Sequence, residues 1–278
     1  MIEPHAVTAT REPVWVRRIV IAISIGFVGL FVLVPLATVF GEALRNGLAA
    51  YVHAIRDPAA LSAVKLTFLA AGIAVPLNLV FGIAASWAIA RFRFPGRSIL
   101  LTLIDLPLAV SPVIAGMVFV LLFGKHGLLG PFLAARHVPI IFALPGIVLA
   151  TTFVTFPFVA RELIPLMEAQ GAEEEEAAIV LGASGWQTFV RVTLPKIKWG
   201  LLYGVVLCTA RAMGEFGAVS VVSGHIRGRT NTLPLHVEIL YNEYEYQAAF
   251  AVASLLVVLA LATLVARRVI ARRVEVTT

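Results

Sequence analysis

The chain has 278 residues, of which 60% are hydrophobic and only 14% are charged, and its mean hydropathy is +0.94. This composition lies well outside the range of soluble globular proteins and is typical of a membrane protein. The formal net charge is +6, but the basic residues lie between apolar runs, so membrane orientation explains them better than nucleic-acid binding. The single cysteine, Cys208, lies inside an apolar run, which excludes an intrachain disulfide and a CxxC pair.

Six apolar runs are each long enough to cross a bilayer as a helix, which takes about 20 residues. They are continuously apolar rather than alternating, so helices are predicted and a barrel is not. The predicted fold class is therefore all-α, a polytopic membrane protein with six transmembrane helices. The first run exceeds the usual apolar region of a signal peptide and is expected to be a retained anchor. The predicted spans are 19–40, 61–90, 99–123, 138–160, 197–222 and 250–266.

The distribution of basic residues predicts the orientation. Six spans place both chain ends on one side, and with these ends in the cytoplasm the Lys and Arg residues are strongly biased inward. The prediction is a cytoplasmic N-terminal tail (1–18), a membrane domain (19–266) with a cytoplasmic loop at 161–196, and a cytoplasmic C-terminal tail (267–278). The inward set is Arg11, Arg17, Arg18, Arg91, Arg93, Arg97, Arg161, Arg191, Lys196, Lys198, Arg267, Arg268, Arg272 and Arg273; the outward set is Arg45, Arg56, Lys125, Arg136, Arg227 and Arg229, with Lys65 at a boundary.

The loop 161–196 is unusually polar for this chain. Pro165 suits an early helix position, and four glutamates at 173–176 require one side of a helix to stay wet or to meet cations. Gly182 is a typical residue just beyond a helix end. Ser184 with Gln187 predicts a capping box that opens a second short helix, and Leu194-Pro195 is expected to end this unit. The loop is either an amphipathic hairpin lying on the membrane surface or a docking element for an aqueous partner.

A family resemblance favours docking. The pattern Glu176-Ala177-Ala178, then Gly182, then Val192-x-Leu194-Pro195 resembles the EAA loop of ABC-importer permeases, which docks into a cleft on a cytoplasmic ATPase. The resemblance implies a type I importer permease fold, with 184–190 as the coupling helix. The expected ATPase-coupling residues are Glu176, Ala177, Ala178, Gly182, Ser184, Trp186, Phe189, Leu194 and Pro195.

The chain carries no GxxxxGK[ST] motif, so it has no phosphate-binding loop of its own. ATP hydrolysis is therefore expected in a separate partner subunit, and this chain is expected to be a transport subunit and not an enzyme. No cofactor is expected. The six histidines are scattered without an HExxH pattern, so no metal site is predicted.

The fifth span contains two charged residues, Arg211 and Glu215, four positions apart and hence able to pair on one helical face. A charge in mid-membrane costs about 2.5–3.5 kcal/mol on insertion scales, so such residues usually face a pathway or a protein partner. A purely structural ion pair is an equally weighted alternative. The hypothesis is a translocation path or gate formed by Arg211, Gly214, Glu215, Gly217, Ser220 and Ser223. Asp105, in the third span, is either a further gate residue or a helix-capping carboxylate.

Three stretches resemble the oxyanion permeases: Arg211–Gly217, Leu106–Pro112 with Gly116, and 223–238. The last is most similar to the CysW-like subunit of the sulfate/thiosulfate importers. The resemblance implies a bacterial inner-membrane complex with a homologous CysT/CysU-like permease, two CysA-like ATP-binding subunits and a periplasmic sulfate/thiosulfate-binding protein. The alternatives are a molybdate/tungstate permease, or a self-sufficient secondary transporter or channel.

Overall fold

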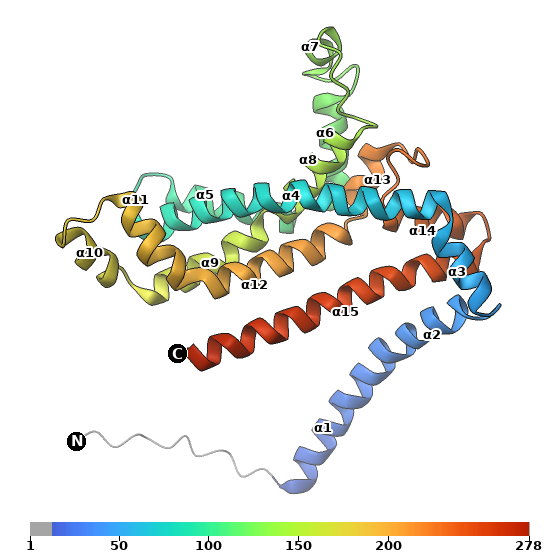
Figure 1. Cartoon of the computed structure of the whole chain (residues 1–278), viewed down its shortest axis with the longest axis horizontal. Helices are drawn as coiled ribbons and strands as arrows, with labels where there is room; N and C mark the ends of the chain where they lie inside the picture. The colour runs from blue at the N-terminus through green and yellow to red at the C-terminus, as the bar shows by residue number, and fades with distance from the viewer. Residues whose placement is uncertain (1–12, 278) are drawn as a thin grey trace.

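The computed structural model describes residues 13–277, with side chains described for 13–270, and this part of the chain is helical without strands. Figure 1 shows the helices in chain order. Their bounds are α1 Val14–Val28, η1 (a π-helical turn) Gly29–Leu33, α2 Val34–Ala43, α3 Leu48–Arg56, α4 Pro58–Arg91, α5 Arg97–Ala109, α6 Pro112–Phe123, α7 Gly130–Ala135, α8 Leu144–Thr155, α9 Pro157–Gln170, α10 Glu173–Val180, α11 Gly185–Thr188, η2 (π-helical) Phe189–Thr193, α12 Leu194–Met213, α13 Gly217–Ser223, α14 Leu233–Asn242 and α15 Tyr246–Thr277.

Six candidate membrane-spanning segments correspond in order to the six predicted runs, but only four of the segments are unbroken. These four are Val14–Ala43, Pro58–Arg91, Leu144–Gln170 and Tyr246–Ile270. The other two are bent helix pairs, α5 with α6 and α12 with α13, and six spans result when each pair counts as one. The all-α polytopic architecture is therefore as predicted, and the helices extend beyond several of the predicted apolar runs.

The third predicted span, 99–123, is not one helix. α5 ends at Ala109 and α6 begins at Pro112, with an angle of 107° between them. Ser111, which precedes the proline, has extended dihedrals (φ −58°, ψ 130°), as the clash with a proline ring requires. As a result α6 and α7 project away from the bundle, as Figure 1 shows.

The fourth predicted span, 138–160, is displaced along the chain. Residues 138–143 form no helix, and the spanning segment begins at Leu144 and continues through α9 to Gln170. Pro165 consequently lies inside α9 and does not start a helix, contrary to the prediction. The helix continues through Pro165 because its buried residues, including Leu163 and Met167, are packed into the bundle on either side of the proline.

One buried cluster lies where α4, α9 and α12 pack together, and it includes Val75, Leu163 and Ile197. A buried polar contact joins α4 and α12 to α8. Asn78 Nδ2 donates to Thr155 Oγ1 at 2.7 Å and lies 3.6 Å from the sulfur of Cys208. In hydrocarbon, hydrogen bonds between helices of this kind contribute about 0.6–2 kcal/mol and fix which faces meet.

The long helices give the molecule two well-separated ends. In Figure 1, α10, α11 and the last turns of α15 lie at one end of the long axis, and α3 and α14 lie at the other. The polar loop therefore stands on the same side as the end of α15. The bends of α5–α6 and α12–α13 lie between these two ends, within the bundle.

Candidate functional site

The polar loop contains the helix, turn and second helix that its sequence predicts. α10 closes with a Schellman motif, in which Ala183 N donates to Ala178 O at 3.0 Å and Gly182 N donates to Ile179 O at 2.9 Å. Gly182 has φ +89°, a conformation that costs a residue with a Cβ free energy. The turn between the two helices is therefore specified by a glycine in the position where one is needed.

The second helix opens with the predicted capping box. Ser184 Oγ accepts from Gln187 N at 3.3 Å, and Gln187 Oε1 accepts from Ser184 N at 2.9 Å. The prediction that Leu194-Pro195 ends this unit is wrong, because the helix runs without interruption from Gly185 to Met213. The π-helical turn η2 precedes Pro195, which sits in the first turn of α12, where its missing N–H is tolerated.

Ionic contacts fasten the loop to the membrane helices. The carboxylate of Glu175 accepts from Arg91 Nε at 2.6 Å and Nη2 at 3.2 Å, and from Thr193 Oγ1 at 2.8 Å. The side chains of Arg91 and Glu175 are only 9% and 11% exposed. Lys196 Nζ lies 2.9 Å from Glu174. Two of the four glutamates, Glu174 and Glu175, meet cations, and Glu173 and Glu176 are exposed, as expected, but no feature of the sequence identified Glu175 as the buried one.

A group of apolar side chains on the loop points into solvent. Val180 and Leu181 are 86% and 88% exposed, and Trp186 is 73% exposed. Trp186 stacks on Phe189 with ring centroids 5.8 Å apart, and Phe189 in turn contacts Trp87 of α4 at 5.1 Å. The loop therefore exposes an apolar surface formed by Val180, Leu181 and Trp186, which we call the apolar knob. The short helices that carry it are capped and are tied to the membrane helices by ion pairs.

The motif residues differ in exposure. Glu176, Ala177, Gly182 and Ser184 are exposed, whereas Ala178, Phe189 and Leu194 are half-buried. Pro195 is exposed. The loop thus brings the predicted coupling residues into one element, although Leu194 and Pro195 lie on its continuation into the membrane.

The second predicted region lies at the bend between α12 and α13. Arg211 Nη1 lies 2.6 Å from Glu215 Oε2, so the predicted pair forms. The two residues do not share one regular helix, because α12 ends at Met213 and the axis turns by 50°. Glu215 is buried and its other oxygen accepts from Ala218 N at 2.9 Å, which anchors the first turn of α13. Arg211 retains 34% side-chain exposure.

The bend is packed closely against α6. A Cβ added to Gly116 of α6 would lie 2.7 Å from Ala218 O and 2.9 Å from Val221 Cβ, so only glycine fits at this crossing. Gly217 lies at the same contact, where an added Cβ would be 3.0 Å from Pro112 Cβ. Gly214 directly follows the last residue of α12 and is exposed. The two bent spans therefore touch at their breaks.

The two serines of the predicted gate make local contacts. Ser220 Oγ donates to Gly217 O at 2.9 Å, and the buried Ser223 Oγ accepts from His225 N at 3.2 Å. Arg211, Gly214, Glu215 and Gly217 gather at the bend, while Ser220 lies one turn further along α13 and Ser223 lies at its C-terminal end.

Asp105 does not cap a helix. Its carboxylate Oδ1 lies 3.3 Å from Arg161 Nε, a contact between α5 and α9 in which both side chains are more than half exposed. Arg161, which the sequence assigns to the cytoplasmic side, lies within the helical segment Leu144–Gln170, nine residues before its C-terminal end.

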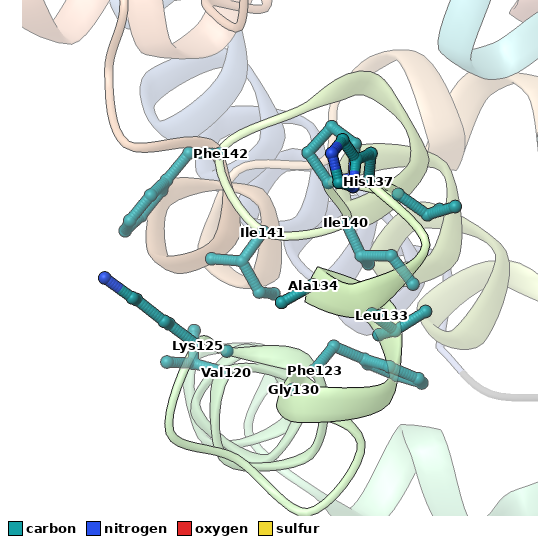
Figure 2. Close-up of a pocket in the computed structure, with 13 residues that line it drawn as sticks. Val120, Phe123, Lys125, Gly130, Leu133, Ala134, His137, Ile140, Ile141 and Phe142 are labelled. Carbon is teal, nitrogen blue, oxygen red and sulfur yellow. The ribbon is translucent and has the colours of Figure 1, made fainter.

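A cavity of about 580 Å³ lies in the hairpin formed by α6, α7 and residues 138–142. Figure 2 shows its lining: Ile140, Ile141 and Leu133 surround the cavity, with Lys125 and Phe142 toward one side and His137 toward the other. Because its walls are mainly hydrophobic, the cavity lacks the convergent donors that an anion requires. It lies apart from the polar loop, but Phe142 in its wall donates its N–H to Val222 O at 2.8 Å, next to Ser223 of the second predicted region. Among residues 13–270, no cluster of His, Cys, Asp and Glu has the arrangement of a metal site.

The comparisons with known proteins decide the family. The family model described as "Binding-protein-dependent transport system inner membrane component" matches residues 78–276. The chain belongs to this family of transport permeases. It is 53% identical over 253 residues to "Sulfate transport system permease protein CysW" of Synechococcus elongatus, covering 91% of this chain and 88% of the relative. It is 38% identical over 233 residues to the protein named CysT of Escherichia coli, covering 84% of each chain.

The fold agrees with this membership. The crystal structure of a bacterial alginate ABC transporter contains a chain that superposes with TM-score 0.76, covering 94% of this chain and 95% of that one at 18% identity. The transport permease described here therefore has the type I importer permease fold. As a member of this family it is a transport component and not an enzyme.

Proposed function

We propose that this permease forms the membrane path of an ATP-driven importer for sulfate or thiosulfate. The observation that carries the proposal is the likeness to CysW, which extends over nine-tenths of the chain at 53% identity. The likeness extends over most of the chain and not over an isolated motif, which supports a transport role like that for which these relatives are named. The chain also provides an element suited to receiving mechanical work, the loop built on α10 and α11.

The loop is proposed to dock into a cytoplasmic ATPase. An element that transmits force should be rigid and should offer an aromatic anchor near its centre. The Schellman turn and capping box supply rigidity, and the buried Arg91–Glu175 pair ties the base of the loop to α4. Trp186 is the anchor, because its indole is 73% exposed yet held from behind by Phe189.

The orientation follows from this role. With the loop in the cytoplasm, the end of α15 is also cytoplasmic, because both lie at the same end of the molecule (Figure 1). The positive-inside bias of the loops supports the same assignment. The location proposed is the bacterial inner membrane, with both chain ends inside.

The partners are proposed from the same likeness. Relatives named CysW and CysT are both similar to this chain, at 53% and 38% identity, which supports pairing with a homologous CysT-like permease rather than with a second copy. Two ATP-binding subunits would receive the two coupling loops. A periplasmic sulfate- or thiosulfate-binding protein would deliver the anion at the end formed by α3 and α14.

Arg211 is proposed to meet the anion at the bend. A divalent anion crosses hydrocarbon only where hydrogen-bond donors and positive charge replace its water. The guanidinium of Arg211 is partly exposed and suits a tetrahedral oxyanion, while Glu215 holds it by one 2.6 Å contact and opposes tight binding of the anion.

The test is uptake of labelled sulfate, thiosulfate and molybdate by proteoliposomes that contain the complete complex, the binding protein and ATP on the cytoplasmic face. Sulfate or thiosulfate uptake that requires the ATPase is the expected result. Preference for molybdate would overturn the substrate assignment, and uptake by this chain alone would overturn the ATP-driven mechanism. Normal assembly and wild-type sulfate import by Arg211→Gln and Glu215→Gln would exclude the proposed gate.

A further inference from the structure

We infer that Arg161 and Asp105 form a second anion-binding point, in the cytoplasmic half of the translocation path. The inference rests on the proposed import of sulfate or thiosulfate and adds a site to it. Arg161 Nε lies 3.3 Å from Asp105 Oδ1, and the two side chains are 58% and 56% exposed. The ligand is a tetrahedral divalent oxyanion.

The depth of this pair is unusual for an exposed ion pair. Asp105 lies eight residues into α5 from Arg97, which is about 12 Å along a helix axis. Arg161 lies nine residues before the end of α9 at Gln170, about 13 Å by the same measure. The segment Leu144–Gln170 is about 40 Å long and exceeds a hydrocarbon core of about 30 Å, so with the segment centred in the core Arg161 lies about 8 Å inside its cytoplasmic face, and Asp105, which contacts it, lies at the same depth. Charges at that depth face a pathway or a protein, because contact with lipid is too costly.

The pairing geometry separates this pair from a structural ion pair elsewhere in the molecule. Arg91 and Glu175 are about one-tenth exposed and bonded through two guanidinium nitrogens, and Arg91 also donates to Met167 O. Arg161 approaches Asp105 most closely through Nε, at 3.3 Å, without a hydrogen bond between the two side chains, and the Arg161 side chain is over half exposed. The outer nitrogens of the Arg161 guanidinium therefore have space to bind an oxyanion bidentately.

A polar stripe leads from this pair to the cytoplasmic side. On α5, Ser98, Thr102 and Asp105 are all exposed and follow one another at helical spacing on one face. On α9, Glu168 and Arg161 are exposed seven positions apart, on one face of that helix. α5 and α9 pack against each other, and a second ion pair, Arg97–Glu168 at 2.6 Å, joins their cytoplasmic ends.

These features describe an exit route. An anion released from the bend meets the Arg161 guanidinium, which Asp105 already half-neutralises, so that binding is weak enough for release. The stripe below it carries hydroxyl groups and water instead of lipid. Asp105 is the positioning residue, and Arg161 contacts the anion.

The decisive experiment measures sulfate imported per ATP hydrolysed by the reconstituted complex with saturating sulfate-loaded binding protein. Arg161→Gln removes one charge-assisted contact and is expected to lower this ratio about tenfold, with Arg161→Lys restoring part of it. Arg97→Gln is the matched control, since it breaks the other ion pair between the same two helices, and it should stay within about twofold of wild type.

The double variant Arg161→Gln with Asp105→Asn separates a path from a structural lock. If the pair is only structural, the defect of Arg161→Gln comes from the unpaired carboxylate of Asp105. The double variant removes that charge, so it would assemble and import normally, and this result would overturn the inference. A path residue predicts that the double variant assembles, as judged by co-purification, but stays as deficient as Arg161→Gln. A wild-type ratio in Arg161→Gln would overturn the inference alone, whereas no sulfate import by the wild-type complex would overturn the proposed function with it.

A second measurement tests the hydrated stripe directly. The chain's single native thiol, Cys208, is fully buried, so a cysteine at position 102 is the reactive one. Thr102→Cys should react with an anionic, membrane-impermeant thiol reagent added from the cytoplasmic side, and millimolar sulfate should slow the reaction. Absence of labelling in both the nucleotide-free and ATP-bound complex would contradict the exit route.

Discussion

The buried pair of Arg91 and Glu175 predicts a large local effect from one substitution. Glu175→Ala removes the acceptor of two guanidinium bonds and of the Thr193 hydroxyl, and it leaves Arg91 charged and only 9% exposed. Removing one partner of a buried pair typically costs 3–5 kcal/mol, since the remaining charge has lost both water and counter-ion. At about 1.4 kcal/mol per factor of ten, the population of the form in which α10 is folded against the membrane helices should fall roughly 100- to 3,000-fold relative to the form in which α10 is detached.

Amide hydrogen exchange over α10, with the complex in lipid nanodiscs, measures this opening. Protection should fall at least 100-fold in Glu175→Ala, and Glu173→Gln is the control, because Glu173 is exposed on the same helix. Arg91→Met combined with Glu175→Leu should recover most of the protection, since it removes both buried charges. Protection in Glu175→Ala within tenfold of wild type would refute the assignment of this pair as the fastening of the loop.

Three further predictions concern the cap, the helix crossing and a buried histidine. Ser184→Ala should cost the first turn of α11 about 1 kcal/mol, seen as faster amide exchange there and contradicted by unchanged exchange. Gly116→Ala should destabilise the folded protein by about 1–3 kcal/mol, because the new Cβ would lie 2.7 Å from Ala218 O. Gly72→Ala is the control, since its Cβ meets nothing within 4 Å and should not lower the thermal midpoint. Equal midpoints for the two variants would contradict the close packing of α6 on α13. Burial lowers the pKa of His236, with partial opposition from nearby carboxylates, so the unfolded chain binds the proton more readily and stability should fall as pH drops through about 6.5. His236→Asn should flatten that dependence between pH 7 and 5, and an unchanged slope would assign it to other groups.

Some of the molecule could be predicted because it depends on local or one-dimensional features. The length of an apolar run compared with bilayer thickness predicts a span without knowledge of its neighbours. The capping box at Ser184 and the positive φ of Gly182 depend on residues within one turn, so their sequence signals were sufficient.

Other features depend on contacts between distant residues. Which of the four glutamates is buried is decided by Arg91, 84 positions away from Glu175, and no local pattern identifies it. The contact of Asp105 with Arg161 requires the antiparallel packing of α5 on α9. Pro112 and Gly214 are residues that can break a helix, and the structure does break there. The prediction nevertheless gave single spans, because both runs are continuously hydrophobic.

Cross-linking from position 186 tests the central claim most directly. In the assembled complex, Trp186→Cys provides an exposed thiol at the apolar knob, and Tyr244→Cys provides one just after α14, at a position that is 78% exposed. Helix α14 lies at the opposite end of the molecule from α11 (Figure 1). With a short thiol-to-amine cross-linker, Trp186→Cys should link to the ATP-binding subunit and Tyr244→Cys should not. A cross-link from Tyr244→Cys to the ATPase, or none from Trp186→Cys while the complex remains intact, would contradict the coupling role and the orientation proposed for this permease.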